Sequence, residues 1–323
     1  MFGQVVIGPP GTGKSTYCHG MFQFLSAIGR KCSIVNLDPA NESLPYAACS
    51  FDIRDYISLE EIMDQAILGP NGALMYAMES LDQNAMEGLI DAWTELGRTD
   101  YLIFDCPGQV ELFTHHNSFF KLFHLFAKKA DSRLCTVALI DSYSLTSASQ
   151  YISMLLLSLR SMIQLELPHV NVISKIDLLD TYQELPMRLD FYTEVQDLKQ
   201  LLSLVEQESP TVLGRNYVRL TELIAELIED YNLVGFEVLA IENKRTMINL
   251  LRVIDKANGY AYGSLELGAD HIWAEAVRNS ARAEFDVDLH DRWVVNKKLY
   301  DEAERKGDLL QQEALNEKDG DDL

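Results

Sequence analysis

A stretch near the beginning of the chain has residue types and spacing that suit a phosphate chain. It reads Gly8-Pro9-Pro10-Gly11-Thr12-Gly13-Lys14-Ser15-Thr16, follows the apolar run Phe2–Ile7, and fits the pattern Gly, four residues, Gly-Lys-Ser/Thr. Glycines let consecutive backbone N–H groups turn inward at the positive end of the next helix, where they form an anion-binding nest. In such a loop the lysine reaches the β- and γ-phosphates and the serine hydroxyl ligates Mg²⁺. The predicted nucleoside triphosphate ligands are Gly8, Gly11, Thr12, Gly13, Lys14, Ser15 and Thr16.

Three further polar clusters each follow an apolar run that is typical of a buried strand. In chain order they are Asp38, Asp105-x-Pro-Gly-Gln109 and Ser174-Lys175-x-Asp177. An open α/β sheet binds its ligand at the carboxyl ends of its strands, so these clusters are expected around the triphosphate. Asp38 could hold a Mg²⁺-bound water or orient the attacking water, and Asp105 could be an outer-sphere partner of the same ion. Each cluster alone is also typical of a turn or of a solvated surface. Their order along the chain, each after an apolar strand, favours a nucleotide-binding site.

The last cluster is a variant of the Asn-Lys-x-Asp guanine reader. The Asp177 carboxylate can accept hydrogen bonds from the N1–H and the 2-amino group of guanine, whereas adenine offers neither donor. GTP is therefore the expected nucleotide. Ser174 replaces the usual asparagine, and because serine is shorter it is expected to lose one contact to the base or to the phosphate loop.

Strands and helices alternate along the chain, which predicts right-handed crossovers and a parallel sheet. Strands are expected at Phe2–Ile7, Cys32–Leu37, Tyr101–Phe104, Leu134–Ile140, His169–Ile173 and Phe236–Ala240. Helices are expected at Lys14–Ile28, Leu59–Leu68, Ala73–Leu96, Phe119–Lys129, Ser147–Leu165, Phe191–Glu206, Tyr217–Tyr231 and Arg245–Asn258, with a weaker pattern at Ala269–Ala283 and disorder at Asn316–Leu323. The predicted fold class is α/β: a P-loop NTPase with a mostly parallel central sheet flanked by helices, with helical insertions and an acidic C-terminal extension.

Charge and cysteine content narrow the class of protein. The net charge of −22 over 323 residues, with no basic stripe, argues against binding nucleic acid through its phosphates. The five cysteines are scattered and form no Cys-x-x-Cys, which favours a reducing compartment without structural zinc. The chain enters an apolar strand at once and its apolar runs are short. We therefore expect an intracellular protein without a signal peptide or membrane contact.

The chain resembles the GPN-loop GTPases, a family of dimerising P-loop GTPases. The resemblance covers about Met1 to Tyr262. Two features are most like the second of the three eukaryotic paralogues: the extension after Gly263 and the sequence Leu37-Asp-Pro-Ala-Asn-Glu42. The motifs that carry it are Gly8–Thr16, Asn36-Leu-Asp-Pro-Ala40, the namesake Gly69-Pro70-Asn71, Asp105-Cys-Pro-Gly-Gln-Val-Glu-Leu112 and Leu167-Pro-His-Val-Asn-Val-Ile-Ser-Lys-Ile-Asp177. By this resemblance residues 1–262 form the GTPase domain, with a GPN insertion at about 52–98 and a helical insertion at about 178–235. Residues 263–323 form the extension.

The resemblance implies a composite catalytic site. Two protomers pack face to face across their nucleotides, and Asn71 of one approaches the phosphates of the other in place of an arginine finger. Gly69 and Pro70 shape the turn that carries it; without the resemblance, Gly69–Gly72 would be interpreted as a turn between helices. The remaining implied roles are Asp38, Gln109 and Glu111 for placing Mg²⁺ and the attacking water, Ser15, Asp38 and Asp105 for Mg²⁺ itself, and Ala240 for a backbone contact to the guanine O6.

The resemblance also implies partners and a biological output. The expected partner is a second copy of the chain or another GPN-loop GTPase, which gives a homodimer or a heterodimer. The expected clients are RNA polymerase subunits or assembly factors, above all of polymerase II, whose assembly and nuclear import the protein would assist. The expected location is the cytoplasm and also the nucleus. No residue identifies the client. Two alternatives stay open: a small-molecule kinase, although only scattered arginines (Arg188, Arg215, Arg219) are present for a phosphoryl-binding lid, and a nucleotide-locked scaffold that scarcely hydrolyses GTP. The apolar faces of the helical insertion suit either core packing or a pocket for a client peptide.

Overall fold

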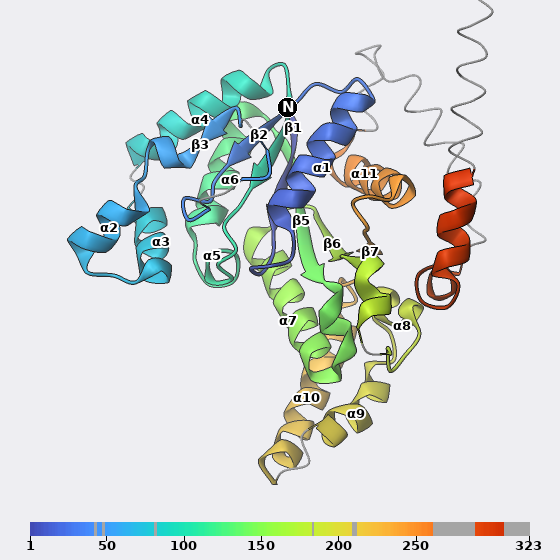
Figure 1. Cartoon of the computed structure of the whole chain (residues 1–323). Coiled ribbons are helices and arrows are strands. Elements are labelled where there is room, and N and C mark those ends of the chain that lie inside the picture. Colours follow the sequence, from blue (N-terminus) through green and yellow to red (C-terminus); the bar gives the residue numbers. More distant parts are fainter. Residues whose placement is uncertain are drawn as a thin grey trace, which may run out of the picture.

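The computed structural model describes residues 1–41, 44–46, 49–80, 83–182, 184–208, 212–260 and 288–306, and within them seven strands form one sheet (Figure 1). Every pairing is parallel, and the order is β3-β2-β4-β1-β5-β6-β7. The strands are β1 (Phe2–Ile7), β2 (Cys32–Asn36), β3 (Phe51–Asp52), β4 (Tyr101–Asp105), β5 (Arg133–Asp141), β6 (His169–Ser174) and β7 (Phe236–Val238). This confirms the predicted α/β class with a parallel central sheet.

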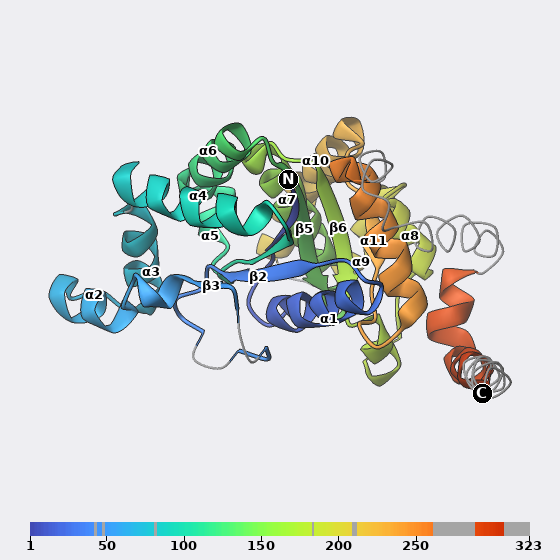
Figure 2. The same ribbon diagram turned by 90° about the horizontal axis from the view of Figure 1, so that it is seen from above.

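Helices cover both faces of the sheet, as the view from above shows (Figure 2). Alternate residues of β1 point to opposite faces: Val6 belongs to the core beneath α1 and α11, and Val5 and Ile7 to the core beneath α4 and α6. Both faces are apolar because a parallel sheet is buried on both sides. The covering helices are α1 (Lys14–Ala27), α11 (Lys244–Asn258), α4 (Gln83–Gly97), α5 (Glu111–Thr114), α6 (Ser118–Ala130) and α7 (Ala148–Leu165).

Strand register brings the predicted clusters to one edge of the sheet. Asp105 at the end of β4 lies beside Val6 of β1 on one side and Asn36 of β2 on the other. Ser174 at the end of β6 lies beside Asp141 at the end of β5. Because the strands are parallel, the segments that follow their carboxyl ends emerge at the same edge as the phosphate loop.

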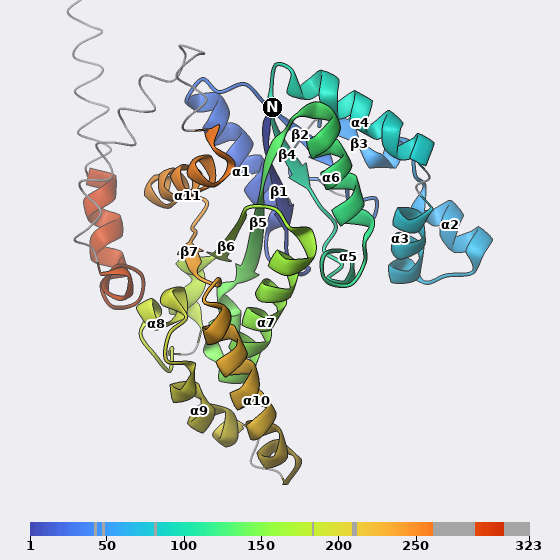
Figure 3. The same cartoon turned by 180° about the vertical axis from the view of Figure 1, so that it is seen from behind.

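Two groups of helices extend away from the sheet at different places (Figures 1 and 3). One is α2 and α3, which precede α4; the other is α8, α9 and α10, which lie between β6 and β7. Their bounds are α2 (Leu59–Ala66), α3 (Pro70–Glu79), α8 (Leu189–Glu194), α9 (Leu202–Glu208) and α10 (Val212–Tyr231).

Two predicted helices are each divided, and one short strand was not predicted. The helix expected at Ala73–Leu96 is α3 followed by α4, although apolar periodicity continues across the break. The helix expected at Phe191–Glu206 is interrupted because Val195 and Asp197 adopt left-handed backbone, with φ of 55° and 56°. Strand β3 has only two residues, too few to produce a periodic signal.

The described part of the C-terminal extension is residues 288–306, which contain the π-helical turn η6 (Asp291–Val295) and a helix over 297–306. The expectations for Ala269–Ala283 and Asn316–Leu323 lie outside the described residues. No helix in the described ranges has the length and apolar character needed to cross a bilayer.

Candidate nucleotide site

The phosphate loop has the geometry of an anion-binding nest ahead of a helix. Gly13 is the N-cap of α1 and has a φ of 86°, a left-handed conformation that suits glycine. The α1 N-terminus therefore presents its free N–H groups at the end of the loop. Pro10, Gly11, Gly13, Lys14, Ser15 and Thr16 line a cavity of about 740 Å³. Gly8 and Thr12 are buried beneath the loop, where the Thr12 hydroxyl donates to the Pro9 carbonyl over 2.9 Å.

Lys14 is the cation of this cavity. Its side chain is folded back, with Nζ donating to the Pro9 carbonyl over 3.2 Å, and only 8% of the residue is exposed. Burial lowers the pKa of Lys14, and the negative charges of Asp105 and Asp38 oppose that effect. Gly108 makes room for the ammonium group, since a Cβ at that position would lie 3.0 Å from Nζ. A desolvated cation next to backbone N–H groups is suited to binding phosphate oxygens.

Of the two carboxylates expected near Mg²⁺, Asp38 lines this cavity, whereas Asp105 is buried and is not among the lining residues. Asp38 Oδ1 accepts the Ala40 N–H over 2.9 Å, and burial raises the pKa of Asp38. Asp105 is buried, which raises its pKa, and its Oδ2 accepts the Tyr46 hydroxyl over 2.9 Å. Asp105 Oδ1 is buried and, within the described residues, receives no hydrogen bond of standard geometry, although the Ser15 hydroxyl lies close enough to lower the pKa of this carboxyl against the effect of burial. An acceptor left without a donor in this position suits a water of the metal shell.

These residues fit Mg²⁺ bound together with a nucleotide. In phosphate sites this ion takes one or two protein oxygens and completes its shell with water and phosphate. Ser15 lines the cavity with Asp38, and its Oγ lies 3.3 Å from Asn41 Nδ2. No group of three or more His, Cys, Asp or Glu side chains with metal-binding geometry occurs among the residues that the structure describes. A metal ion here would therefore depend on the phosphates as well as the protein.

The residues expected to place the attacking water face the same cavity. Gln109, which precedes α5, and Glu111, its first residue, are among its lining residues. Gln109 Oε1 is buried and, within the described residues, has no hydrogen-bond donor. This carbonyl oxygen is thus available to accept a hydrogen bond from a water molecule inside the cavity.

The Gly-Pro-Asn motif is the beginning of a helix rather than a complete turn. Gly69 is the N-cap of α3 and Pro70 is its first residue, where the missing N–H costs nothing. Asn71 is exposed and lines the cavity of its own chain together with Leu74. The structure holds one chain, so the expected approach of Asn71 to a partner's phosphates stays a prediction.

The guanine-reader residues are joined to the phosphate loop by short hydrogen bonds. The Ser174 hydroxyl lies 2.8 Å from the Thr12 carbonyl and 3.0 Å from the Ile140 carbonyl. Lys175 Nζ donates to the Gly11 carbonyl over 2.6 Å and to Asp141 Oδ2 over 2.7 Å. Serine therefore keeps a contact to the phosphate loop, and the expected loss of one contact relative to asparagine stays a prediction.

Asp177 and Ala240 lie together on a second cavity of about 420 Å³. Asp177 is in the first turn of the 3-10 helix η3 (Ile176–Thr181). The backbone N–H of Ala240 donates to the Thr246 hydroxyl over 3.2 Å, and that hydroxyl donates to the Ala240 carbonyl over 2.7 Å. The Ala240 amide is thus already paired with α11, so a direct bond from it to a base oxygen would have to share or replace this contact.

Sequence reasoning missed the side chains that orient the predicted ones. Asp141 pairs with Lys175, Tyr46 donates to Asp105, and Asn41 contacts Ser15. Asp141 carried the same signal as Asp38 and Asp105, because it directly follows an apolar strand. Tyr46 and Asn41 lie in an irregular segment after β2, and no local pattern marks them.

Comparisons with known proteins show similarity over most of the chain. A family model described as "Conserved hypothetical ATP binding protein" matches residues 6–260. The chain is 56% identical over 321 residues to GPN-loop GTPase 2 of Saccharomyces cerevisiae, covering 98% of this chain and 92% of that protein. It is 50% identical over 303 residues to GPN-loop GTPase 2 of Schizosaccharomyces pombe, covering 94% of each.

A solved structure supports the fold independently. The chain superposes on a GTPase in apo form from Pyrococcus abyssi with a TM-score of 0.62 and 22% sequence identity, covering 79% of this chain and 97% of the other. The names of the yeast relatives confirm the expected resemblance to the second eukaryotic paralogue. Since these relatives share half or more of their residues with it over nearly their full length, the chain belongs to the GPN-loop GTPase family.

Proposed function

We propose that this protein binds GTP with Mg²⁺ and hydrolyses it as a dimeric molecular switch. One observation carries the proposal: the phosphate loop, the Asp38 and Asp105 carboxylates, Gln109 and the guanine reader meet at the carboxyl edge of one sheet. Hydrolysis needs little covalent work from a protein, because positioning and counter-charge dominate phosphoryl transfer. The site supplies both.

The reader favours GTP over ATP, although the description of the matching family model names ATP. Lys175 is held against the phosphate loop by its bonds to Gly11 and Asp141, which leaves its aliphatic stem as a surface for a base. Asp177 follows two residues later, where its carboxylate can accept the two donors of guanine. A kinase gains no support, since the guanidinium groups of Arg188 and Arg219 pair with Asp288 and Glu222.

Each residue has a definable part in hydrolysis. Lys14 and the loop N–H groups neutralise the phosphate oxygens, and Gln109 and Glu111 hold a water in line with the terminal phosphorus. Bound Mg²⁺ would supply further counter-charge, held by Ser15 and, through water, by Asp38 and Asp105. The partner subunit's Asn71 would donate its amide to the phosphoryl oxygens, replacing the charge of an arginine finger.

Asn71→Ala is expected to slow GTP hydrolysis about a hundredfold, the usual cost of removing one donor aimed at developing negative charge. GTP affinity should stay within about threefold of wild type, because an exposed residue on the rim contributes little to ground-state binding. Single-turnover phosphate release at a protein concentration that gives dimers measures the first quantity, and equilibrium binding of a fluorescent GTP analogue measures the second.

A matched amide provides the control. Gln65 on α2 is also exposed, and Gln65→Ala should leave both quantities unchanged. Unchanged hydrolysis in dimeric Asn71→Ala would remove the motif from the catalytic site. No hydrolysis by the wild-type dimer at all would instead favour the nucleotide-locked scaffold.

We further propose that the switch acts on a protein client, an RNA polymerase II subunit or assembly factor with a basic surface. The helical insertion offers a surface for it: five apolar side chains at spacings of three or four residues on α10 are 44% to 61% exposed. They are Tyr217, Leu220, Leu223, Leu227 and Tyr231. A chain with a net charge of −22 is suited to a basic partner.

Three other apolar side chains of the insertion belong to the core and not to a pocket. Tyr192, Leu198 and Leu201 are buried in the core beneath α7 and α10, so the proposal is placed on the exposed α10 face. Leu220→Asp combined with Leu227→Asp should reduce recovery of RNA polymerase II subunits in affinity purification at least about tenfold, because a charge would enter an apolar contact. Unchanged recovery, with GTP binding intact, would exclude this face.

A further inference from the structure

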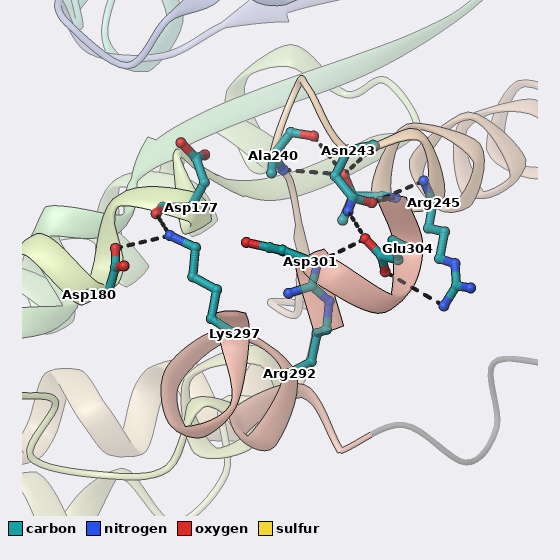
Figure 4. Close-up of polar contacts among 10 residues, drawn as sticks. Asp177, Asp180, Ala240, Asn243, Arg245, Arg292, Lys297, Asp301 and Glu304 are labelled. Carbon is teal, nitrogen blue, oxygen red and sulfur yellow. Dashed lines mark hydrogen bonds and ion pairs between the residues drawn. The ribbon is translucent and has the colours of Figure 1, made fainter. Parts of the chain in front are cut away.

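Residues 288–306, here called the C-terminal strap, lie against the core domain although 27 residues outside the described ranges separate them from Tyr260 in the chain. The strap is anchored by Trp293, which is 4% exposed and belongs to the same hydrophobic core as Ile176 and Leu179 of η3. Its first residues contact the start of α8: His290 Nδ1 accepts the Leu189 N–H over 3.2 Å, and Asp288 pairs with Arg188. These contacts place the following helix at the base-reading end of the site (Figure 4).

The strap contacts the guanine reader through Lys297. Its Nζ donates to the backbone carbonyl of Asp177 and forms an ion pair of 3.0 Å with Asp180 (Figure 4). The side chain of Lys297 is 18% exposed, so this cation is largely withdrawn from water. Lys297 therefore restrains the backbone of the residue that is expected to read guanine, without using the Asp177 carboxylate.

The strap also contacts the loop after β7, through Glu304. Its Oε2 accepts the Asn243 amide over 2.8 Å, and its Oε1 lies 3.6 Å from Arg245 Nη1. Asn243 in turn caps α11, since its Oδ1 accepts the N–H groups of Arg245 and Thr246 over 3.0 and 3.1 Å. Thr246 holds Ala240 through both backbone groups, so Glu304 is linked to the second base-contact loop by a short chain of hydrogen bonds.

Arg292 holds Glu304 in place from within the strap. It is 5% exposed, and its Nη2 donates to Asp301 Oδ1 over 2.8 Å and to Glu304 Oε2 over 3.0 Å. The guanidinium carbon lies 4.3 Å from the centre of the Trp293 ring. The cavity of about 420 Å³ lies between the two sides: Asp177, Ala240 and Asn243 line it from the core domain, and Trp293, Lys297 and Glu304 from the strap.

We propose that the C-terminal strap positions the guanine-reading loops, with Lys297 and Glu304 as its positioning residues. The inference rests on the proposed GTP site and deepens it, by assigning guanine affinity and selectivity in part to residues outside the GTPase domain. The physical reason is geometric. A carboxylate accepts hydrogen bonds from both donors of guanine only when it is held at hydrogen-bond distance. If the carboxylate is displaced, the hydrogen bonds that distinguish guanine from other purines are lost.

Lys297→Ala in the full chain is expected to raise the dissociation rate of a fluorescent GDP about tenfold, the effect of losing one charge-assisted hydrogen bond. The preference for GTP over inosine triphosphate, which lacks the 2-amino group, should fall about fivefold, because part of that discrimination depends on Asp177 being in place. The hydrolysis rate at saturating GTP should stay unchanged, since the contacts of Lys297 with the described residues are to Asp177 and Asp180, on the base side. Lys297→Arg, which keeps a donor and the charge, should restore most of the selectivity.

Lys298 is the matched control, because it is the neighbouring lysine and is exposed. Lys298→Ala should leave the dissociation rate and the GTP-to-inosine preference at wild-type values. If Lys297→Ala lowers the thermal midpoint enough to compromise the fold, Glu304→Ala tests the same claim at the other contact and is expected to give the same two changes.

The proposal is overturned if both variants keep the wild-type dissociation rate, or if GTP and inosine triphosphate lose affinity equally. The second result would mean that the strap supports the fold without positioning the reader. A wild-type protein that binds GTP no better than ATP would contradict the proposed function itself, and that outcome is visible before any strap variant is measured.

Discussion

Lys14→Ala is expected to lower GTP affinity at least about a hundredfold, the combined effect of losing two charge-assisted hydrogen bonds to phosphate oxygens. Lys14 is the buried cation of the phosphate cavity, and its only protein acceptor within the described residues is the Pro9 carbonyl at 3.2 Å. Its attraction to Asp105 and Asp38 only partly offsets the desolvation that lowers its pKa. A triphosphate supplies the missing counter-charge, which is why the loss should appear in binding.

Equilibrium titration with a fluorescent GTP analogue measures this loss, and the thermal midpoint of the nucleotide-free protein shows whether the fold is kept. Lys256→Ala is the control, because Lys256 is an exposed lysine in the last turn of α11. It should not change affinity. GTP affinity retained in Lys14→Ala would show that the nucleotide binds elsewhere.

Asp177→Asn is expected to change the preferred nucleotide from GTP to XTP. The carboxylate can accept from both N1–H and the 2-amino group of guanine, whereas an amide offers one acceptor and one donor, which suits the N1–H and 2-oxo group of xanthine. GTP affinity should fall about a hundredfold, because a buried donor on the base would face a donor on the protein. XTP affinity should rise by a similar factor, so the ratio of the two changes far more than either alone.

Competition of GTP and XTP against a fluorescent nucleotide measures both affinities in one experiment. Asp197→Asn is a suitable control, since Asp197 lies beyond the reader in a left-handed conformation that asparagine also adopts. Equal loss of GTP and XTP in Asp177→Asn would mean that this residue supports the loop without reading the base.

Much of the nucleotide site could be predicted because its signals are local. The strand, loop and helix around Lys14 are contiguous, so spacing alone indicates the nest and the cation. Asp38, Asp105 and Ser174 each follow an apolar strand, and parallel strands bring such positions to one edge whatever their order in the sheet. The Gly-Pro-Asn motif by itself does not indicate a catalytic role, because only the family resemblance distinguishes it from an ordinary helix start. In the structure Asn71 lies at the rim of the cavity of its own chain.

The sequence by itself therefore determined the fold class, the phosphate loop and the carboxylates at the strand ends. Only the tertiary structure decided which side chains orient them: Tyr46 for Asp105, Asp141 for Lys175, and Lys297 for the backbone of Asp177. Lys297 and Asp177 are 120 residues apart, and nothing in either segment indicates that they meet. Local patterns reflect the periodic burial of helices and strands, whereas contacts between distant segments depend on how the whole chain packs.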